Sequence, residues 1–459
     1  MHAQLNLHPD FDIAAHRVRP KIAVKFGPEL VLENQKKFIY RIRSIETEMV
    51  KDFKESIRPA IGDELLAING IALSQWSEEN FIFCKFPLRT QCAINIFDHF
   101  RKGFLSWDWR ASLKYTIKRN GRVWTIDVPF EIPSKAISAN QVIEINKKNS
   151  CHLESSTYDD FEMMYQGLNI CVFESKKYPQ VTLLKIGSFR YRDLPRNILI
   201  QSLQDEVDQF NSHYWQAKSS TTKKLIIDLI DNGGGDVPVP WYKIFYDSPF
   251  QEQYVEFKKL AELDIDEIRK ELFYENQGKE IWFQDLKSRG IYQKILLGNF
   301  LPAIPQFCAL ELKNCKQGLF HPQSHGFKGQ VRILSNEWCI STCSGFVWSM
   351  KQELKGRVKI IGIPDSGDSS YARLYLDVYL DPNHSEGFRL AVTSRVGGQQ
   401  QQLPEGALLR QQVSATRSTD AHGKIISGNP SPVDVWVPYE YYSFDDSWES
   451  KTFKAALLY

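Results

Sequence analysis

The chain has 459 residues, of which 42% are hydrophobic, and a formal net charge of +2. This length predicts two or three domains, each large enough for its own core. The nearly balanced charge predicts no attraction to nucleic acid. No apolar run is long enough to cross a membrane. The eight cysteines are scattered through a long chain, which predicts mostly reduced thiols.

Residues 1–19 are expected to form a short N-terminal strand segment, and residues 20–132 a β-rich domain. Met1–Pro9 lacks the charged and then apolar pattern of a signal peptide, and the compartment stays open. Within residues 20–132 a strand and turn are expected at Ile61–Leu73, a helix from near Ser74, and other strands at Lys21–Phe26, Phe38–Ile42, Leu113–Lys118 and Val123–Val128, the last two joined by an Asn120-Gly121 turn.

Residues 133–178 are polar and are expected to form a linker and the entry to a second domain, residues 179–459. A strand at Val181–Ile186 and a helix at about Asn197–Gln216 open that domain. The run Leu225–Ile230 is apolar except for Asp228 and stops at Gly233-Gly234-Gly235. Such a run predicts a buried parallel strand, and glycines beyond its end let the backbone approach a ligand.

Residues 249–328 show helical spacing of apolar residues and predict a mainly helical insertion. After it, Val331–Leu334 predicts a strand, followed by a turn of small residues, a helix to about Leu354 and a strand at Val358–Gly362. A helix from Ser447 to Tyr459 closes the chain. Ser341 and Thr342 lie between the strand and the helix, where a hydroxyl faces the edge of the sheet beside a helix N-terminus. A plain N-cap is the alternative interpretation.

These segments together resemble the tail-specific (C-terminal processing) serine peptidases, a group that includes the tricorn core protease and the chlamydial protease-like activity factor. The resemblance lies in Asp228-Leu229 with Asn232-Gly233-Gly234, then the strand, turn, serine and helix around Ser341. It implies an α/β fold with a crotonase/ClpP-like spiral catalytic core. It also implies a nucleophile at Ser341 and oxyanion donors at Thr342 and at Gly233 or Gly234. Ser344 is the rival nucleophile.

The N-terminal domain supports the same resemblance. Its Gly62-Asp63 and Asn69-Gly70 pattern is similar to the corresponding strand and turn of PDZ domains. In this family a PDZ-like module precedes the catalytic core. A simple hairpin turn is the alternative interpretation of Asn69-Gly70.

The general base is where the chain departs from one branch of the family. The tail-specific branch uses a lysine whose position falls near Asp368, and no lysine occurs there. The tricorn and chlamydial branch uses a histidine before the PDZ-like module, and His2 is the candidate here. His99 is the fallback base, although a structural histidine is its ordinary interpretation.

The third catalytic position departs from the family as well. Ser427 stands where the tricorn and chlamydial branch has a glutamate. A serine can orient an imidazole but cannot stabilise its positive charge. The expected function is therefore a serine endopeptidase that acts on peptide or unfolded protein. The alternatives are a protease-derived peptide-binding protein and, less favoured, a crotonase-like acyl-CoA enzyme.

Neither a cofactor nor a metal ion is expected. His321, His325, Cys339 and Cys343 could be imagined as a zinc set, but no Cys-x-x-Cys spacing supports it. An oligomer is compatible with the sequence, which does not predict one.

Overall fold

The computed structural model divides the chain into two compact units. One unit comprises Asn6–Ser138 and Pro438–Trp448, and the other Met1–Leu5, Ala139–Val437 and Glu449–Tyr459. The structure describes residues 5–7, 19–20, 24–30, 38–45, 53–81, 113–128, 130–131, 160–189, 204–235, 238–251, 253–259, 288, 290–296, 298–305, 319–323, 326–367, 373–380, 383, 388–393, 407–414, 416–437 and 448–459.

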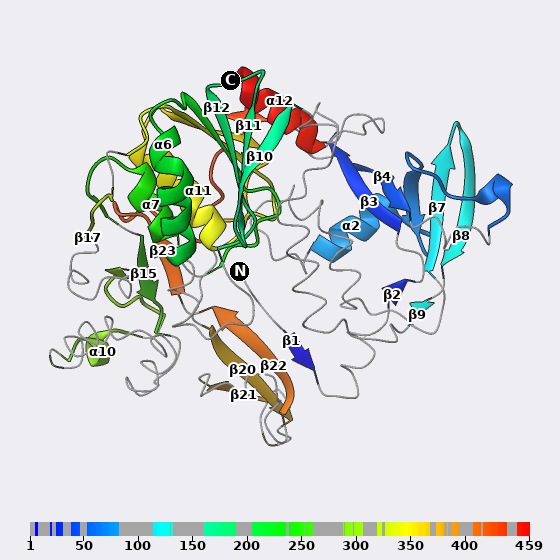
Figure 1. Cartoon of the computed structure of the whole chain (residues 1–459). Coiled ribbons are helices and arrows are strands. Elements are labelled where there is room, and N and C mark those ends of the chain that lie inside the picture. The colour runs from blue at the N-terminus through cyan, green and yellow to red at the C-terminus, as the bar shows by residue number, and fades with distance from the viewer. Residues whose placement is uncertain are drawn as a thin grey trace. The chain divides into compact units, whose positions relative to one another are not determined.

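The N-terminal unit is built on an antiparallel sheet in the order β3-β4-β5-β7-β8, with β6 paired to β5 (Figure 1). Its longer elements agree with the strands, helix and hairpin predicted for residues 20–132. They are β3 (Val24–Leu30), β4 (Phe38–Ile45), β5 (Glu64–Ile68), β6 (Ile71–Ala72), α2 (Leu73–Phe81), β7 (Leu113–Arg119) and β8 (Arg122–Val128), with the short η2 (Glu55–Ile57), β1 (Leu5–Leu7), β2 (Arg19–Pro20) and β9 (Phe130–Glu131).

The two Asn-Gly turns of this sheet have the backbone that their sequences predict. Asn69 and Gly70 have φ values of 50° and 79°, and Asn120 and Gly121 have 47° and 79°. Positive φ at both central residues matches the twist of a two-residue hairpin. The buried Asp63 forms a two-pronged ion pair with Arg119, at 2.5 and 2.7 Å, and ties the start of β5 to the end of β7.

The larger unit contains a seven-stranded sheet in the order β10-β11-β12-β13-β18-β19-β24. The first three strands are antiparallel, and those from β12 to β24 are parallel. The strands are β10 (Phe161–Gln166), β11 (Ile170–Ser175), β12 (Val181–Ile186), β13 (Lys224–Asp228), β18 (Gln330–Ser335), β19 (Val358–Gly362) and β24 (Val435–Trp436). The predicted buried parallel strand before the three glycines is β13.

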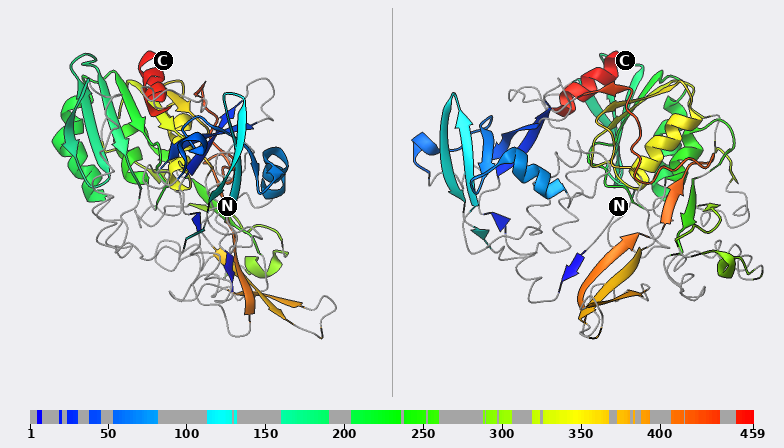
Figure 2. Two further views of the ribbon diagram at one scale, coloured as in Figure 1. Left: turned by 90° about the vertical axis from the view of Figure 1, so that its right-hand side faces the viewer. Right: turned by 180° about the vertical axis from the view of Figure 1, so that it is seen from behind.

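Helices cover both faces of this sheet (Figures 1 and 2). Leu225 and Ile227 of β13 face a core shared with α7 (Val239–Phe245), α11 (Thr342–Glu353) and the helical segment from residue 204 through η3 (Asn211–Trp215) and α6 (Gln216–Lys218). On the other face lies α12 (Trp448–Leu458). The Lys224 ammonium donates to carbonyls of its last turn, and the Arg332 guanidinium donates to the Tyr459 carbonyl just beyond its end. Cations at this end of a helix complement its dipole.

The predicted helical insertion at residues 249–328 is wrong in the parts that the structure describes. These parts contain β14 (Phe250–Gln251), β15 (Tyr254–Phe257), β16 (Ile304–Pro305) and β17 (Leu319–Phe320), and one short helix, α10 (Ile291–Lys294). Phe257, one of the apolar residues of this segment, lies in β15, where it pairs with Thr416 of β23 (Thr416–Thr419). Apolar spacing in so short a segment did not distinguish a helix from a strand.

A further sheet contains β20 (Arg373–Leu380), with β21 (Phe388–Thr393) and β22 (Ala407–Ser414) on its two sides. Among the described residues no helix is long and apolar enough to span a membrane.

Candidate functional site

The candidate site lies at the carboxyl edge of the parallel strands. The glycine loop follows β13 and the segment that contains Ser341 follows β18, its neighbour in the sheet. Parallel neighbours end at the same edge, which is where ligands bind in open α/β sheets. The structure thus brings together the two segments that the sequence singled out, although they are more than a hundred residues apart.

Ser341 forms a sharp elbow between β18 and α11. Its φ of 62° and ψ of −127° lie in a region that residues other than glycine rarely adopt, at a cost on the order of 1–3 kcal/mol. The Ser341 amide donates to the Gly367 carbonyl at 3.2 Å, and the Ser341 carbonyl accepts from the Gly345 amide at 3.0 Å. The hydroxyl forms no N-cap hydrogen bond. Ser341 thus occupies the N-cap position of α11, but its hydroxyl does not cap the helix.

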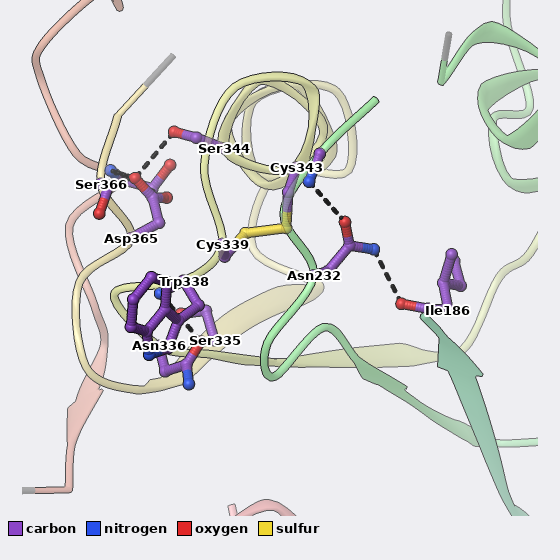
Figure 3. The surroundings of a disulfide bond; sticks show 12 residues. Ile186, Asn232, Ser335, Asn336, Trp338, Cys339, Cys343, Ser344, Asp365 and Ser366 are labelled. Carbon is purple, nitrogen blue, oxygen red and sulfur yellow. Dashed lines mark hydrogen bonds between the residues drawn. A yellow bond between two sulfur atoms is a disulfide. The ribbon is translucent and has the colours of Figure 1, made fainter. Parts of the chain in front are cut away.

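The glycine loop is held against this elbow by side chains from three elements. The buried Asn232 donates to the Ile186 carbonyl at the end of β12 and accepts from the Gly234 amide, at 2.8 and 2.9 Å (Figure 3). The Thr342 hydroxyl at the start of α11 donates to the Gly235 carbonyl at 2.6 Å. The side chain of Asn336, beyond β18, exchanges two hydrogen bonds with Asp231.

Gly234 touches the elbow directly. A Cβ atom at this position would lie 3.0 Å from the Ser341 Cβ and 3.1 Å from the Thr342 amide nitrogen. The Gly234 amide is already bonded to Asn232, whereas Gly233 is exposed and faces open space. Thr342 begins α11, so its amide has no acceptor within the helix. The bond to Asn232 disfavours Gly234 as an oxyanion donor, and the assignment of that role to Thr342 and Gly233 remains a prediction.

Ser344, the rival nucleophile, points away from the glycine loop in the close-up view (Figure 3). It is buried and donates to the Asp365 carboxylate at 2.7 Å. The same carboxylate accepts the amides of Gly367 and Ser431. Burial raises the pKa of Asp365 to about 6, and these hydrogen bonds oppose the rise. Ser344 thus helps to fix the loop whose Gly367 carbonyl holds Ser341.

Cys339 and Cys343 form a disulfide across the elbow, with Ser341 midway between them in the sequence (Figure 3). The prediction of mostly reduced thiols is wrong for the cysteines that the structure describes, since Cys171 is disulfide-bonded as well. Cys339 lies before α11 and Cys343 in its first turn, and the elbow between them brings the two sulfurs together. The bond also removes both cysteines from the zinc set that was considered. Within the described part of the chain no group of side chains is suited to a metal ion.

The remaining predicted site residues are not brought together by the part of the chain that the structure describes. His2, His99 and Asp368 lie outside the described residues. Ser427 is half-buried, and its hydroxyl accepts from the Ser418 amide at 2.6 Å. The assignment of His2 and Ser427 to a catalytic set remains a prediction.

Sequence reasoning missed Asp365 and the Cys339–Cys343 bond. A signal was present for the second, because two cysteines four residues apart flank the candidate nucleophile. Asp365 gave no signal, since a single aspartate after a strand is an ordinary loop residue until the fold buries it.

No protein-family model matches the sequence, and no curated protein matches it. Among solved structures the chain is similar to mature CPAF complexed with lactacystin, with a TM-score of 0.58 and 13% identity over 100% of this chain and 85% of that one. The chain is also similar to mature CPAF, with a TM-score of 0.56 and 13% identity over 99% of this chain and 83% of that one. For the photosystem II D1 C-terminal processing protease the TM-score is 0.33 and the identity 10%, over 96% of this chain and 79% of that one.

The chain therefore has the fold of mature CPAF, which confirms the predicted resemblance at the level of the fold. At these identities the likeness establishes the fold and leaves the chemistry to the residues of the site.

Proposed function

We propose that the chain is a serine endopeptidase that cleaves peptide bonds through an acyl-enzyme at Ser341. The observation that carries the proposal is the strained elbow of Ser341, which lies against the glycine loop at the edge of the sheet. A strained strand-to-helix turn of this kind exposes a nucleophilic hydroxyl, and the next amide supplies half an oxyanion hole.

In this mechanism the Ser341 Oγ attacks the carbonyl carbon of the scissile bond, and a histidine takes the hydroxyl proton. The Thr342 and Gly233 amides stabilise the negative charge that develops on the carbonyl oxygen. The histidine then protonates the departing amine, and water releases the acyl group by the reverse sequence. His2 is our candidate for the base, and Ser427 for the residue that orients it.

The N-terminal unit would present the substrate. We assign residues 20–132 a PDZ-like role, in which an extended peptide adds to the sheet as a strand. The larger unit would be the spiral catalytic core. The substrate class is peptide or unfolded protein.

A fluorophosphonate probe tests the nucleophile. It should label Ser341, and Ser341→Ala should abolish the labelling without unfolding the protein. Ser344→Ala is the matched control, since it removes a hydroxyl three residues away that donates to Asp365. That variant should still be labelled at Ser341. Labelling that survives Ser341→Ala and is lost in Ser344→Ala would assign the nucleophile to Ser344.

The base is tested separately. His2→Ala should remove turnover, and wild-type activity should fall as the pH drops through about 6.5, the ordinary pKa of an imidazole. Ser427→Glu should raise the rate if residue 427 faces the base, because a carboxylate would stabilise the imidazolium. An active His2→Ala variant would exclude this residue as the base.

A peptide-binding protein derived from a protease is the second candidate. It is favoured by Ser427, whose hydroxyl accepts from a backbone amide at a position where the family has a carboxylate. Peptide binding by wild-type protein that no probe labels at Ser341 would support this candidate over the peptidase.

A further inference from the structure

The disulfide between Cys339 and Cys343 closes a ring of five residues with Ser341 at its centre. Both cysteines are fully buried, whereas Ser341 is partly exposed. The bond joins the segment before α11 to the first turn of that helix, which are the two sides of the elbow (Figure 3).

So short a ring does little to hold distant parts of a fold together. The stabilisation that a disulfide provides by restricting the unfolded chain grows with the number of residues it encloses, and here the two cysteines are four apart. The main effect of this bond is therefore on the backbone that it encloses, Ile340-Ser341-Thr342.

Both ends of the ring are anchored. The Cys339 amide donates to the Asn336 carbonyl, and its own carbonyl accepts from the Ser366 amide. Cys343 lies in the first turn of α11, and its side chain belongs to the core beneath the sheet. A covalent bond between two anchored ends restricts the residue midway between them.

Ser341 needs such restriction, because its positive φ persists only where the surroundings impose it. We propose that Cys339 and Cys343 are positioning residues whose disulfide holds Ser341 in its reactive conformation, so that the oxidised protein is active and the reduced protein is impaired. The inference rests on the proposed function, because the disulfide would act on the same serine.

Reduction would proceed by ordinary thiol–disulfide exchange. A dithiol attacks one sulfur, the Cys339 Sγ–Cys343 Sγ bond breaks, and each sulfur ends as a thiol after the pair has gained two electrons and two protons. The dithiol is oxidised to its own disulfide. Because both cysteines are buried, we expect the exchange to be slow and to follow local opening of the elbow.

Substitution tests the inference without depending on reductant access. In Cys339→Ser, Cys343→Ser and the double variant, the maximal rate of fluorophosphonate labelling at Ser341 should fall by about 10- to 100-fold, the range expected when a reacting group is displaced by an ångström or less. The concentration of probe at half-maximal rate should change little. Each single variant should lose as much labelling rate as the double variant, since either substitution alone removes the bond.

Cys171→Ser is the matched control. Cys171 of β11 is also disulfide-bonded and fully buried, but it is not part of the elbow. This variant should keep the wild-type labelling rate even if it unfolds at a lower temperature. A loss of labelling that followed the unfolding temperature across all variants would overturn the inference in favour of general stabilisation.

The redox arm uses wild-type protein treated with dithiothreitol, with the state of both cysteines followed by alkylation and mass spectrometry. Labelling should fall to the level of the double variant as the bond is reduced, and return on reoxidation, while the double variant should not respond. Equal labelling of the verified oxidised and reduced forms would overturn the inference and leave the peptidase proposal standing. Absence of labelling in every form, oxidised wild type included, would overturn both.

Discussion

At the scale of single residues, the site depends on Gly234, because the surrounding backbone leaves no room for a side chain there. Gly234 has a φ of 81°, and a Cβ atom there would lie 2.3 Å from the Ile340 carbonyl oxygen. That oxygen belongs to the backbone, so it cannot move aside as a flexible side chain would. The conformation of the Ser341 elbow therefore depends on a neighbour that has no side chain.

We expect Gly234→Ala to lower the free energy of unfolding by at least about 2 kcal/mol, because a positive φ and an overlap with backbone both oppose the added methyl group. Denaturant unfolding measures the stability. The labelling rate of Ser341 should fall as well, since the added methyl would push against Ser341 and Thr342.

Gly233→Ala is the control for stability. Nothing lies within 4 Å of a Cβ atom at this position, and its φ is not in the left-handed region. Its free energy of unfolding should stay within about 0.5 kcal/mol of wild type, as at open surface sites. Equal losses in the two variants would show that the elbow does not press against Gly234.

At the scale of elements, the glycine loop is positioned by the buried amide of Asn232. This side chain links the end of β12 to the loop that follows β13, through the Ile186 carbonyl and the Gly234 amide. Both partners belong to the backbone, so the amide acts together with the parallel bridge between Phe189 and Gly235 to tie the loop to the chain that follows β12. The orientation of the Gly233 amide depends on it.

Asn232→Ala should therefore cost about 1–3 kcal/mol of stability, the penalty for leaving buried polar groups without partners. It should also lower the labelling rate of Ser341 more than the affinity for the probe. Asn429→Ala offers the comparison, because the exposed Asn429 makes the same type of bond, to the Ile425 carbonyl. Asn429→Ala should change neither the free energy of unfolding nor the labelling rate of Ser341. Wild-type stability in Asn232→Ala would contradict this account of the loop.

At the scale of the whole molecule, stability should depend on pH through buried carboxyl groups, Glu206 and Asp365 among them. Burial raises the pKa of Glu206 to about 7 and that of Asp365 to about 6. Each group keeps its proton in the folded protein at pH values where the unfolded chain, with a pKa near 4, has released it. The folded state then binds more protons, so its stability falls as the pH rises.

For Glu206 the window runs from about pH 4.5, its ordinary pKa, to about 7. Across it the free energy of unfolding of wild type should decline relative to Glu206→Gln by about 3 kcal/mol, as a shift of this size implies. Denaturant midpoints of both proteins, measured at several pH values in this window, test whether stability declines as the pH rises. Parallel curves for the two proteins would show that Glu206 titrates normally in the folded state.

Local sequence determined much of this protein by itself. Short, mainly apolar runs predicted β13, β18 and β19, and glycines marked the end of the first, because a strand buried on both faces needs mostly apolar side chains. The Asn-Gly pairs predicted two turns, since few other residues accept positive φ. The order of these segments also predicted the family of folds to which the chain is similar.

Only the tertiary structure decided the environment of the site. Asp365 became buried because β19 ends beneath α11 and beside the loop that contains Ser431. Cys339 and Cys343 became bonded because the elbow turns the chain back on itself. Phe257 joined a strand because β23, far along the chain, supplied its pairing partner. Burial and strand pairing depend on residues distant in sequence, which local patterns do not record, and closure of the ring depends on the conformation of the elbow between the two cysteines.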